Sequence, residues 1–204
     1  MDATATRVPT YEDFERYLRA VNHVQELLER TTRALDAAGL DYAVIGGNAV
    51  AAWVATIDPQ AVRTTKDVDL LIRRADFDGI AAALRPVGLV PTEVFGVSMF
   101  VEQADPSPRR AVHLLFADEP ITPNDPVPAP RIEGARPGAM GFRVIPLLEL
   151  VQMKLLAFRL RDQTHLIDML ALGLIDAGWR DRLPAALQPR YEQVLEQFER
   201  EERR

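Results

Sequence analysis

The sequence predicts an α/β protein of the α+β kind: a small mixed sheet flanked by helices, with a helical C-terminal part. Helical periodicity opens the chain, short β runs follow between Tyr42 and Phe116, and helical patterns fill the segment after Pro146. The chain has 204 residues, of which 48% are hydrophobic and 26% charged. That composition suits one globular domain, or one domain with a helical annex.

Charge and cysteine content narrow the possible function classes. The net charge of −6 argues against a broadly basic nucleic-acid surface. The chain has no cysteine, which excludes disulfides and thiolate chemistry and fits a cytoplasmic protein. It has no apolar run of about 18 residues, so we expect no transmembrane helix. The N-terminal segment Met1–Thr4 lacks the basic and apolar regions of a signal peptide.

The first predicted element is an amphipathic helix from Thr10 to about Ala38. Thr10 and Asp13 resemble a capping pair, with Asp in place of the usual Glu, and Gly39 ends the helix. Its apolar face carries Phe14, Tyr17, Leu18, Val21, Val24 and Leu28 at helical spacing.

Short strands and helices alternate in the middle of the chain. The predicted strands are Tyr42–Ile45, Asp67–Ile72, Val97–Gln103, Ala111–Phe116 and a short edge strand at Arg143–Ile145. The predicted helices are Asn48–Ala55 and Asp76–Leu84, and the predicted loops are Ile57–Lys66 and the Pro- and Gly-rich Glu119–Gly141. We expect the third and fourth strands to pair, because turn residues join them.

Helices dominate the last third of the chain. Pro146 opens a helix that runs to about Leu160, at the position where proline is best tolerated. Further helices are predicted at His165–Leu172 and from Pro189 to the end. We therefore divide the chain into an α/β domain with an N-terminal helix, residues 1–145, and a helical part packed on it, residues 146–204.

Gly46 and Gly47 stand between a β run and the helix that starts at Asn48. Glycine lets the backbone turn with positive φ and lets a bulky anion approach the N–H groups. The N-terminus of the following helix favours phosphate at the same place. From these residues alone, a phosphate-binding loop and an ordinary turn after a strand both stay open.

Asp67 and Asp69 share one face of their predicted strand, because side chains alternate along a strand. Two charges about 6.6 Å apart repel by roughly 2.5 kcal/mol at an effective dielectric of ~20. A divalent cation on that face would reverse the sign of this energy, and magnesium prefers oxygen ligands. The alternative is a solvent-facing polar edge that pairs with Arg63 or Lys66.

The two segments Val44–Ala49 and Arg63–Leu70 together resemble the signature of the DNA polymerase β-like nucleotidyltransferase superfamily. In that pattern a hydrophobic strand ends in Gly-Gly or Gly-Ser, and an Asp-x-Asp strand follows. The Arg-x-Thr-x-Asp-x-Asp form is most similar to predicted bacterial nucleotidyltransferases that include abortive-infection toxins and minimal nucleotidyltransferases. Leu150–Leu155 and Arg159–Asp162 also resemble the C-terminal part of this group.

The resemblance implies a nucleotidyltransferase-like fold and a metal-dependent reaction. In this family an acceptor hydroxyl attacks the α-phosphate of a nucleoside triphosphate, and pyrophosphate leaves. The resemblance gives Asp67 and Asp69 a catalytic role as ligands of one or two Mg²⁺ or Mn²⁺ ions. Around the nucleotide it places Gly46, Gly47, Asn48, Arg63, Thr65, Lys66 and Lys154.

His113 marks the main departure from the family pattern. The family's third carboxylate, which helps to activate the attacking hydroxyl, sits on a later strand, and here His113 occupies the expected position. Imidazole can accept a hydroxyl proton near neutral pH, and it suits manganese better than magnesium. We expect His113 to share the face of Asp67 and Asp69 and to act as a catalytic residue; the alternative is a histidine held by a backbone carbonyl.

The other charged residues have competing interpretations. Lys154 contacts phosphates or is a surface lysine that snorkels past apolar neighbours. Arg159, Arg161 and Asp162 are expected to form a solvated, mutually paired helix end. His165 receives no function, because no cluster of polar residues surrounds it in the sequence.

Two functions from different classes remain open at this point. One is a nucleotidyltransferase acting on a small molecule, an RNA end such as that of tRNA, or a protein hydroxyl. The other is a non-catalytic nucleotide-binding or regulatory module, for example of a toxin–antitoxin pair, which the replaced third carboxylate favours. A partner protein or a homodimer is compatible with both.

Overall fold

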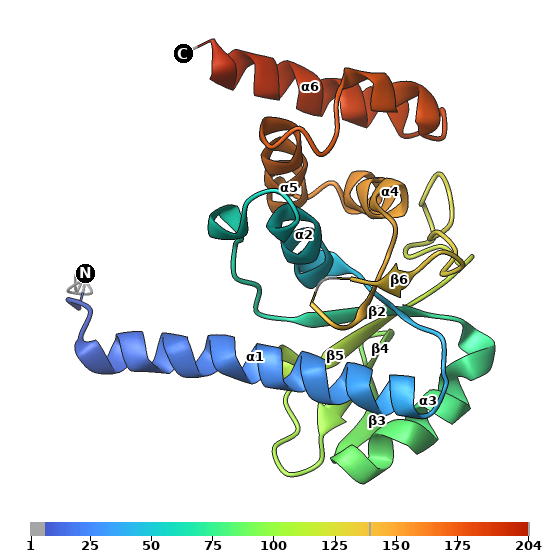
Figure 1. The fold of residues 1–204 in the computed structure, drawn as a ribbon. Helices are drawn as coiled ribbons and strands as arrows, with labels where there is room; N and C mark the ends of the chain where they lie inside the picture. Colours follow the sequence, from blue (N-terminus) through green and yellow to red (C-terminus); the bar gives the residue numbers. More distant parts are fainter. Residues whose placement is uncertain (1–6, 139, 204) are drawn as a thin grey trace, which may run out of the picture.

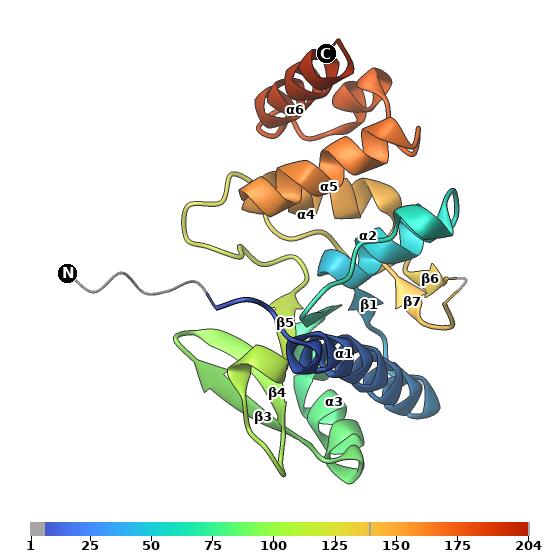
Figure 2. The ribbon, with the colours of Figure 1, turned by 90° about the vertical axis from the view of Figure 1, so that its left-hand side faces the viewer.

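The computed structural model describes residues 7–138 and 140–203, so the segment Met1–Thr4 considered for targeting lies outside the described residues. A seven-stranded mixed sheet in the order β3-β4-β5-β2-β1-β7-β6 forms the centre of this part of the chain. Helices α1 and α3 lie on one side of it, and α2, α4, α5 and α6 are stacked on the other (Figure 1 and Figure 2). The predicted α/β class is thereby confirmed.

The N-terminal helix α1 (Tyr11–Ala37) matches the predicted element. The backbone N–H of Thr10 donates to Asp13 Oδ2 at 2.9 Å, as in a capping box. Gly39 follows the last turn with φ +67°, a conformation that glycine adopts without strain. The second half of α1 is buried against the sheet, whereas its first turns project from the domain and leave Tyr11 and Phe14 exposed.

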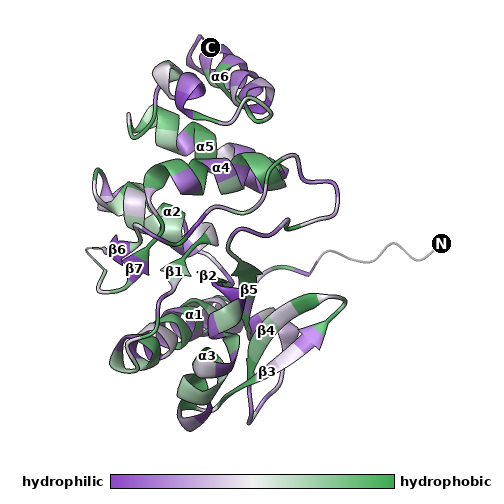
Figure 3. Cartoon of the chain, turned by 90° about the vertical axis from the view of Figure 1, so that its right-hand side faces the viewer, coloured by the Kyte–Doolittle hydropathy of each residue, from purple (hydrophilic) through white to green (hydrophobic). Residues whose placement is uncertain are grey.

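The middle of the sheet is built from β1 (Ala43–Val44), β2 (Val68–Ile72) and β5 (Val112–Phe116). Strand β2 runs antiparallel to β1 and parallel to β5. These strands are central and largely buried, and β5 is coloured as strongly hydrophobic in Figure 3, while the helices alternate in hydropathy. The predicted strands at these places are confirmed, each one or two residues shorter than expected.

Strand β3 (Leu89–Val94) was not predicted, whereas its partner β4 (Val97–Glu102) was. Pro91 argues against a strand at this place, because proline is excluded from central strands. β3 lies at the edge of the sheet, where proline is tolerated. The two strands form a hairpin in which Val94 pairs with Val97. Its two turn residues, Phe95 and Gly96, have φ values of 50° and 78°.

The far edge of the sheet differs from the prediction. Strand β7 (Arg143–Val144) was expected at the edge, but it lies between β1 and the two-residue strand β6 (Arg136–Pro137). The segment predicted as the loop Glu119–Gly141 therefore contributes the edge strand itself. Proline at this outermost position again follows the rule for edge strands.

Two helices cover the middle of the chain. Helix α2 (Gly46–Ala55) was predicted to start at Asn48, but both glycines belong to its first turn. Helix α3 (Phe77–Leu84) follows a short 3₁₀ turn at Arg74–Asp76, in the region predicted as a helix.

The C-terminal helices are α4 (Leu147–Ala157), α5 (Leu160–Ala171) and α6 (Gln188–Glu202). The predicted end of α4 at Leu160 and the predicted start of α5 at His165 are both wrong. Phe158 adopts a left-handed conformation with φ 46°, which ends α4 and lets α5 begin immediately. Neither glycine nor proline marks this corner, so the sequence concealed it.

Two hydrophobic cores meet at α4. Leu150 and Met153 belong to the core that the sheet forms with α1, α2 and α3. Val151 and Leu155 belong to a second core with α5 and α6. The division of the chain at residues 145 and 146 stays a prediction, because α4 takes part in both cores. None of the described helices is long and apolar enough to cross a membrane.

Candidate active site

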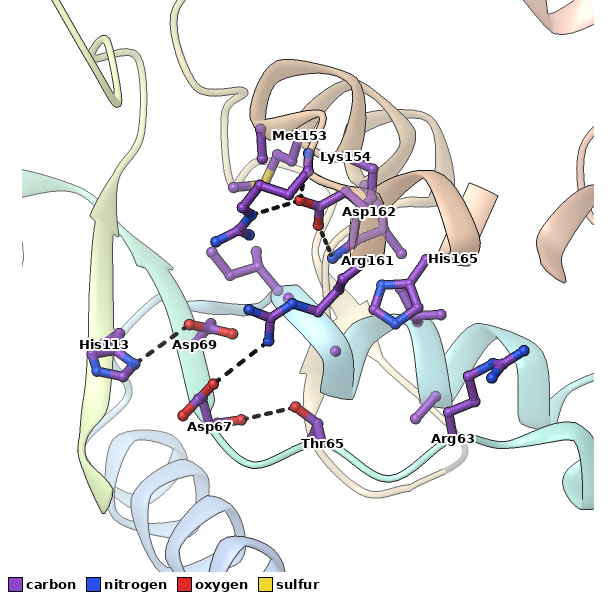
Figure 4. Close-up of a pocket in the computed structure, with 18 of the residues that line it drawn as sticks. Arg63, Thr65, Asp67, Asp69, His113, Met153, Lys154, Arg161, Asp162 and His165 are labelled. Atoms are coloured by element: carbon purple, nitrogen blue, oxygen red, sulfur yellow. Dashed lines mark hydrogen bonds and ion pairs between the residues drawn. The ribbon is translucent and has the colours of Figure 1, made fainter. Parts of the chain in front are cut away.

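Asp67 and Asp69 lie at the start of β2 on the same side of the sheet, and both face a cavity (Figure 4). Val68 and Leu70 point to the other side and are fully buried. The two carboxylate side chains keep 33% and 31% of their surface exposed. Strand alternation therefore places two half-exposed carboxylates over a fully buried hydrophobic layer.

His113 is the direct neighbour of Asp69 in the β2–β5 register. Its Nδ1 lies 3.7 Å from Asp69 Oδ1, and its Nε2 lies 3.0 Å from the carbonyl oxygen of Pro108. The interaction with the Asp69 carboxylate raises the pKa of His113, although burial acts in the opposite direction. The structure thus unites both sequence interpretations: the ring faces the aspartates and is also held by a backbone carbonyl.

Gly46 and Gly47 allow the first turn of α2 to approach β2 closely. Gly46 has φ +66°, and a Cβ atom there would lie 2.0 Å from Asp69 Oδ2. A Cβ atom on Gly47 would lie 2.6 Å from Thr65 Oγ1. Both separations are too short for any side chain, so glycine is required at the two positions for packing against the aspartate strand.

Asn48 and Thr65 hold the backbone that enters β2. Asn48 Nδ2 donates to the carbonyl oxygen of Asp67 at 2.9 Å, and Thr65 Oγ1 lies 3.5 Å from the same oxygen. Thr65 lines the cavity, but Asn48 does not. Asn48 thus holds the backbone of Asp67, and its expected contact with the nucleotide stays a prediction.

Arg63 and Lys66 also line the cavity, but they do not balance the charge of the aspartates as one interpretation had it. The guanidinium of Arg63 is paired with both carboxylate oxygens of Asp168 in α5, at 2.6 and 3.0 Å. Among the described arginines and lysines, the one that forms an ion pair with the aspartates is Arg161, whose Nη1 lies 4.0 Å from Asp67 Oδ2. Arg161 reaches the site because α5 begins earlier than predicted.

Lys154 and Asp162 form a buried ion pair in the wall of the cavity. Lys154 Nζ lies 3.0 Å from Asp162 Oδ1, and Arg159 Nε donates to Asp162 Oδ2 at 2.7 Å. Lys154 and Asp162 are only 5% and 1% exposed, so Lys154 is not a surface lysine. Of the expected solvated helix end, the pairing of Arg159 with Asp162 is present and both Arg159 and Arg161 are exposed, but Asp162 is buried. Burial acts to raise the pKa of Asp162, but Arg159 and Lys154 outweigh it and lower the pKa.

His165 lines the cavity as well, although the sequence gave it no role. Its Nδ1 is buried and makes no hydrogen bond within the described residues. Burial, followed by the charge of Lys154, lowers the pKa of His165 to about 4, so the ring is neutral near pH 7. Spacing along α5 was the missed signal, because Arg161, His165 and Asp168 share one helical face.

The cavity has a volume of about 700 Å³, which is the size of a small-molecule site. Its charged side chains come from the loop before β2, from β2 itself and from the α4–α5 corner: Arg63, Lys66, Asp67, Asp69, Lys154, Arg159, Arg161, Asp162 and Asp168. Further lining residues come from β4, β5 and the segment after β5: Val97, His113, Leu114, Leu115, Ile121 and Thr122. Residues of α2 and α4 also contribute.

Among the described residues, no group of three or more histidine or acidic side chains is arranged to hold a metal ion. His113 therefore does not form a three-residue site with Asp67 and Asp69, and these two carboxylates stand as a pair on the cavity face of β2. This arrangement corresponds to the way magnesium is often held, by one or two carboxylates together with substrate oxygens.

Comparison with known proteins shows the fold. The chain is similar to the crystal structure of ANT(2″)-Ia in complex with adenylyl-2″-tobramycin, with 16% identity and a TM-score of 0.56 over 83% of this chain and 99% of that one. It is also similar to the solution structure of ANT(2″)-Ia, with 14% identity and a TM-score of 0.54 over 90% of this chain and 98% of that one. No protein-family model and no curated protein sequence matches the chain. The chain therefore has a nucleotidyltransferase fold.

Proposed function

We propose that the protein is a metal-dependent nucleotidyltransferase, which moves a nucleoside monophosphate from a nucleoside triphosphate to an acceptor hydroxyl. The observation that carries the proposal is the pair Asp67 and Asp69 on the cavity face of β2. Their ion-pair contacts, with Arg161 at 4.0 Å and His113 at 3.7 Å, are longer than hydrogen bonds. The two carboxylates thus retain oxygen atoms for a ligand that is positively charged.

A divalent cation fits this pair by chemistry and by space. Carboxylate oxygens are the ligands that Mg²⁺ and Mn²⁺ accept, and the glycine at position 46 leaves room beside Asp69. Bound there, the cation would neutralise charge that develops on the phosphate oxygens during transfer. With two protein ligands, the remaining positions are left to the triphosphate and water.

Two exposed cations of the cavity provide positive charge for the triphosphate. They are Lys66 and Arg161, and the N-terminus of α2 begins at the glycine pair. Lys154 already donates to Asp162. We therefore propose that it mainly stabilises the wall of the site and that it contributes less to phosphate binding. Helix N-termini and such cations stabilise phosphate without any covalent chemistry.

His113 is proposed to accept the proton of the acceptor hydroxyl. With Nε2–H donating to the carbonyl of Pro108, Nδ1 keeps a lone pair that faces the aspartates. The acceptor oxygen then forms a bond to the α-phosphorus, the bond from that phosphorus to the bridging oxygen of the β-phosphate breaks, and pyrophosphate leaves. The hydroxyl proton passes to Nδ1, where Asp69 stabilises the imidazolium.

The fold neighbours support this reaction class. ANT(2″)-Ia was determined in complex with an adenylylated antibiotic, which places a nucleotidyl product in a protein of this fold. The low identity restricts that likeness to the fold, so the nucleotide and the acceptor of this chain are matters for experiment. The particular resemblance to abortive-infection toxins likewise stays a prediction.

Labelled nucleotides test the proposal. The protein is incubated with each α-labelled triphosphate, Mg²⁺ or Mn²⁺ and a cell extract, and transfer and pyrophosphate release are followed. We expect transfer with at least one triphosphate. A rate that is much higher with Mn²⁺ than with Mg²⁺ would indicate that His113 binds the metal instead of taking the proton, because manganese tolerates a nitrogen ligand better. The variant His113→Asp restores a carboxylate beside Asp69 and should raise the magnesium-dependent rate.

Saturable binding without pyrophosphate release would favour the alternative, a nucleotide-binding or regulatory module such as a member of a toxin–antitoxin pair. The replacement of the third carboxylate by His113 is the observation behind that alternative. If no triphosphate changes the melting temperature with either metal, both the transferase and the binding module are ruled out, because each requires the nucleotide to bind at the cavity.

A further inference from the structure

One face of α1 carries a continuous seam of side chains. They follow each other at intervals of three and four residues, which is the spacing of one helix face: Tyr11, Phe14, Leu18, Val21, Gln25, Leu28, Thr32 and Leu35. The last three are buried in the domain. Tyr11, Phe14 and Leu18 lie on the part of α1 that projects from the domain in Figure 1, and they are 75%, 54% and 44% exposed. Among the described residues, the seam is therefore covered only along its second half.

A groove of about 500 Å³ opens where the seam enters the domain. It lies between α1, the loop before β2 and the turn before β7, and its apolar lining residues include Val21, Val62, Met140 and Phe142. Met140 is 51% exposed, so apolar surface is open to a ligand there. Exposed rings and an apolar groove thus follow each other along one face of the same helix.

The charges of the projecting part of α1 balance each other. Residues 7–19 hold three arginines and three acidic residues, whereas the whole chain has a net charge of −6. Arg7 and Arg16 pair with Asp13, and Arg19 pairs with Glu15. A strongly charged partner gains little from such a surface, and a second copy of this chain is not repelled by it. The charge pattern therefore favours a second copy over a basic or an acidic partner.

The size of the exposed stripe decides how much contact a partner needs. Tyr11, Phe14 and Tyr17 are between 46% and 75% exposed, and rings that bury about 150–250 Å² each then offer roughly 350 Å² together. A stable interface of standard size buries about 800 Å² on each partner. The stripe alone falls short of this area, so a stable contact has to include the groove as well.

We propose that the protein forms a symmetric homodimer in which two α1 helices pack antiparallel along the seam. Leu18 lies seven residues from both Tyr11 and Gln25, and it lies between Phe14 and Val21. A two-fold axis at Leu18 therefore lays the exposed rings of each copy against the groove of the other. Such an interface is isologous, so every contact occurs twice.

This contact reaches the loop that leads to the active site. The groove shares Arg63, Thr64 and Thr65 with the cavity, and Tyr17 Oη lies 3.2 Å from Thr64 Oγ1. A ring seated in the groove supports this loop from outside the cavity. The dimer does not depend on the proposed function, because the seam contains neither Asp67 nor Asp69.

Cross-linking tests the antiparallel arrangement, because the chain has no cysteine of its own. In Leu18→Cys the two thiols face each other at the two-fold axis, and a short bis-maleimide reagent should join the chains into dimers. In Tyr11→Cys the two thiols lie about 21 Å apart along the helix axis, at 1.5 Å per residue, and should not be joined. A mixture of Tyr11→Cys and Gln25→Cys chains should be joined again.

Sedimentation of the full chain measures the dimer directly. We expect an average mass that rises with concentration towards twice the 22.8 kDa of one chain. Phe14→Lys should raise the Kd of the dimer at least about tenfold, because it places two unpaired ammonium groups in each interface. The matched control Phe95→Lys changes a completely exposed ring on the β3–β4 hairpin and should leave the Kd unchanged. Circular dichroism checks that both variants stay folded, and the cysteine variants test the arrangement without adding charge.

Three results would overturn the homodimer. One is the mass of a single chain up to about 100 µM, since interfaces of standard size bind in the micromolar range or tighter. Another is efficient cross-linking of Tyr11→Cys with itself, which indicates parallel helices. The third is an equal effect of Phe14→Lys and Phe95→Lys on the Kd, which places the contact elsewhere.

Discussion

The strand pair β2–β5 and the α4–α5 corner both supply charged side chains to one cavity, but they treat those charges in opposite ways. At the corner, Asp162 is almost completely buried and receives hydrogen bonds from Lys154 and Arg159. On the strands, Asp67 and Asp69 are a third exposed, and their cationic contacts are 3.7 Å or longer. The charges at the corner are compensated within the protein. The two strand carboxylates are not, as expected of groups that bind a ligand.

The energetic consequences of the two arrangements differ in kind. Breaking a buried pair leaves an isolated charge in a medium that solvates it poorly, and this cost falls on the folded state. Removing one of two neighbouring, half-exposed carboxylates relieves repulsion and costs the free protein little. The comparison therefore predicts stability effects at the corner and ligand effects on the strands.

The largest effect is expected for Lys154→Met. The substitution keeps the apolar part of the side chain but removes the ammonium from Asp162. It should lower the free energy of unfolding by about 3 kcal/mol, the low end for a broken buried pair, because Arg159 still donates to Asp162. Urea titration of the free protein measures it. The control Arg161→Met changes a 62% exposed cation in the same cavity and should shift stability by less than about 0.5 kcal/mol. Similar losses in both variants would contradict a structural role for the pair.

Asp69→Asn should behave in the opposite way. The free protein should keep its stability to within about 1 kcal/mol, since the change removes a partly exposed charge. The stabilisation by triphosphate with Mn²⁺, roughly 2.7 kcal/mol at a ligand concentration 100 times the Kd, should disappear. Thermal unfolding with and without ligand gives both numbers. A variant that unfolds easily yet still binds the nucleotide would reverse the comparison.

The strand half of the site could be predicted from the sequence, because strand geometry follows directly from residue order. Alternation puts Asp67 and Asp69 on one face, and it puts His113 on the face opposite Val112 and Leu114. Parallel pairing of two adjacent strands then brings Asp69 and His113 together. Only the glycine pair was read incompletely, since Gly46 and Gly47 open α2 and also make space for side chains of the aspartate strand.

The corner could not be predicted, because its geometry depends on one residue whose type does not indicate it. Phe158 takes a left-handed conformation that is normally a sign of glycine or asparagine. It moves the start of α5 to Leu160 and thereby turns Arg161 and His165 toward the cavity. The burial of Lys154 depends on the same turn, which brings Asp162 against it.

The pH dependence of stability gives a third test. Burial lowers the pKa of His165 to about 4, whereas an imidazole in the unfolded chain titrates near 6.5. Between these values the unfolded state binds more protons, so stability falls as the pH drops from about 6.5 to 4. We expect a loss of about 1–2 kcal/mol, reduced from the full shift because the ring is partly exposed.

The variant His165→Gln isolates this contribution. The difference in unfolding free energy between the variant and the original protein, plotted against pH, should have a slope in the window from pH 4 to 6.5 and be flat above it. A difference that stays constant through the window would mean that folding does not lower the pKa of the ring. His165 would then resemble the half-exposed aspartates of β2 rather than the buried charges of the α4–α5 corner.

The smallest effect is expected at the tip of the β3–β4 hairpin, a segment outside the cavity lining. Asparagine tolerates the left-handed conformation that Phe95 adopts with φ 50°. Phe95→Asn should therefore raise the free energy of unfolding by about 0.5–1 kcal/mol, which urea titration measures. As a control, Gly96→Ala in the same turn, where φ is 78°, should lower stability by a similar amount. A Phe95→Asn variant that is less stable would mean that the exposed ring stabilises the hairpin, and that contacts at the turn outweigh the backbone conformation there.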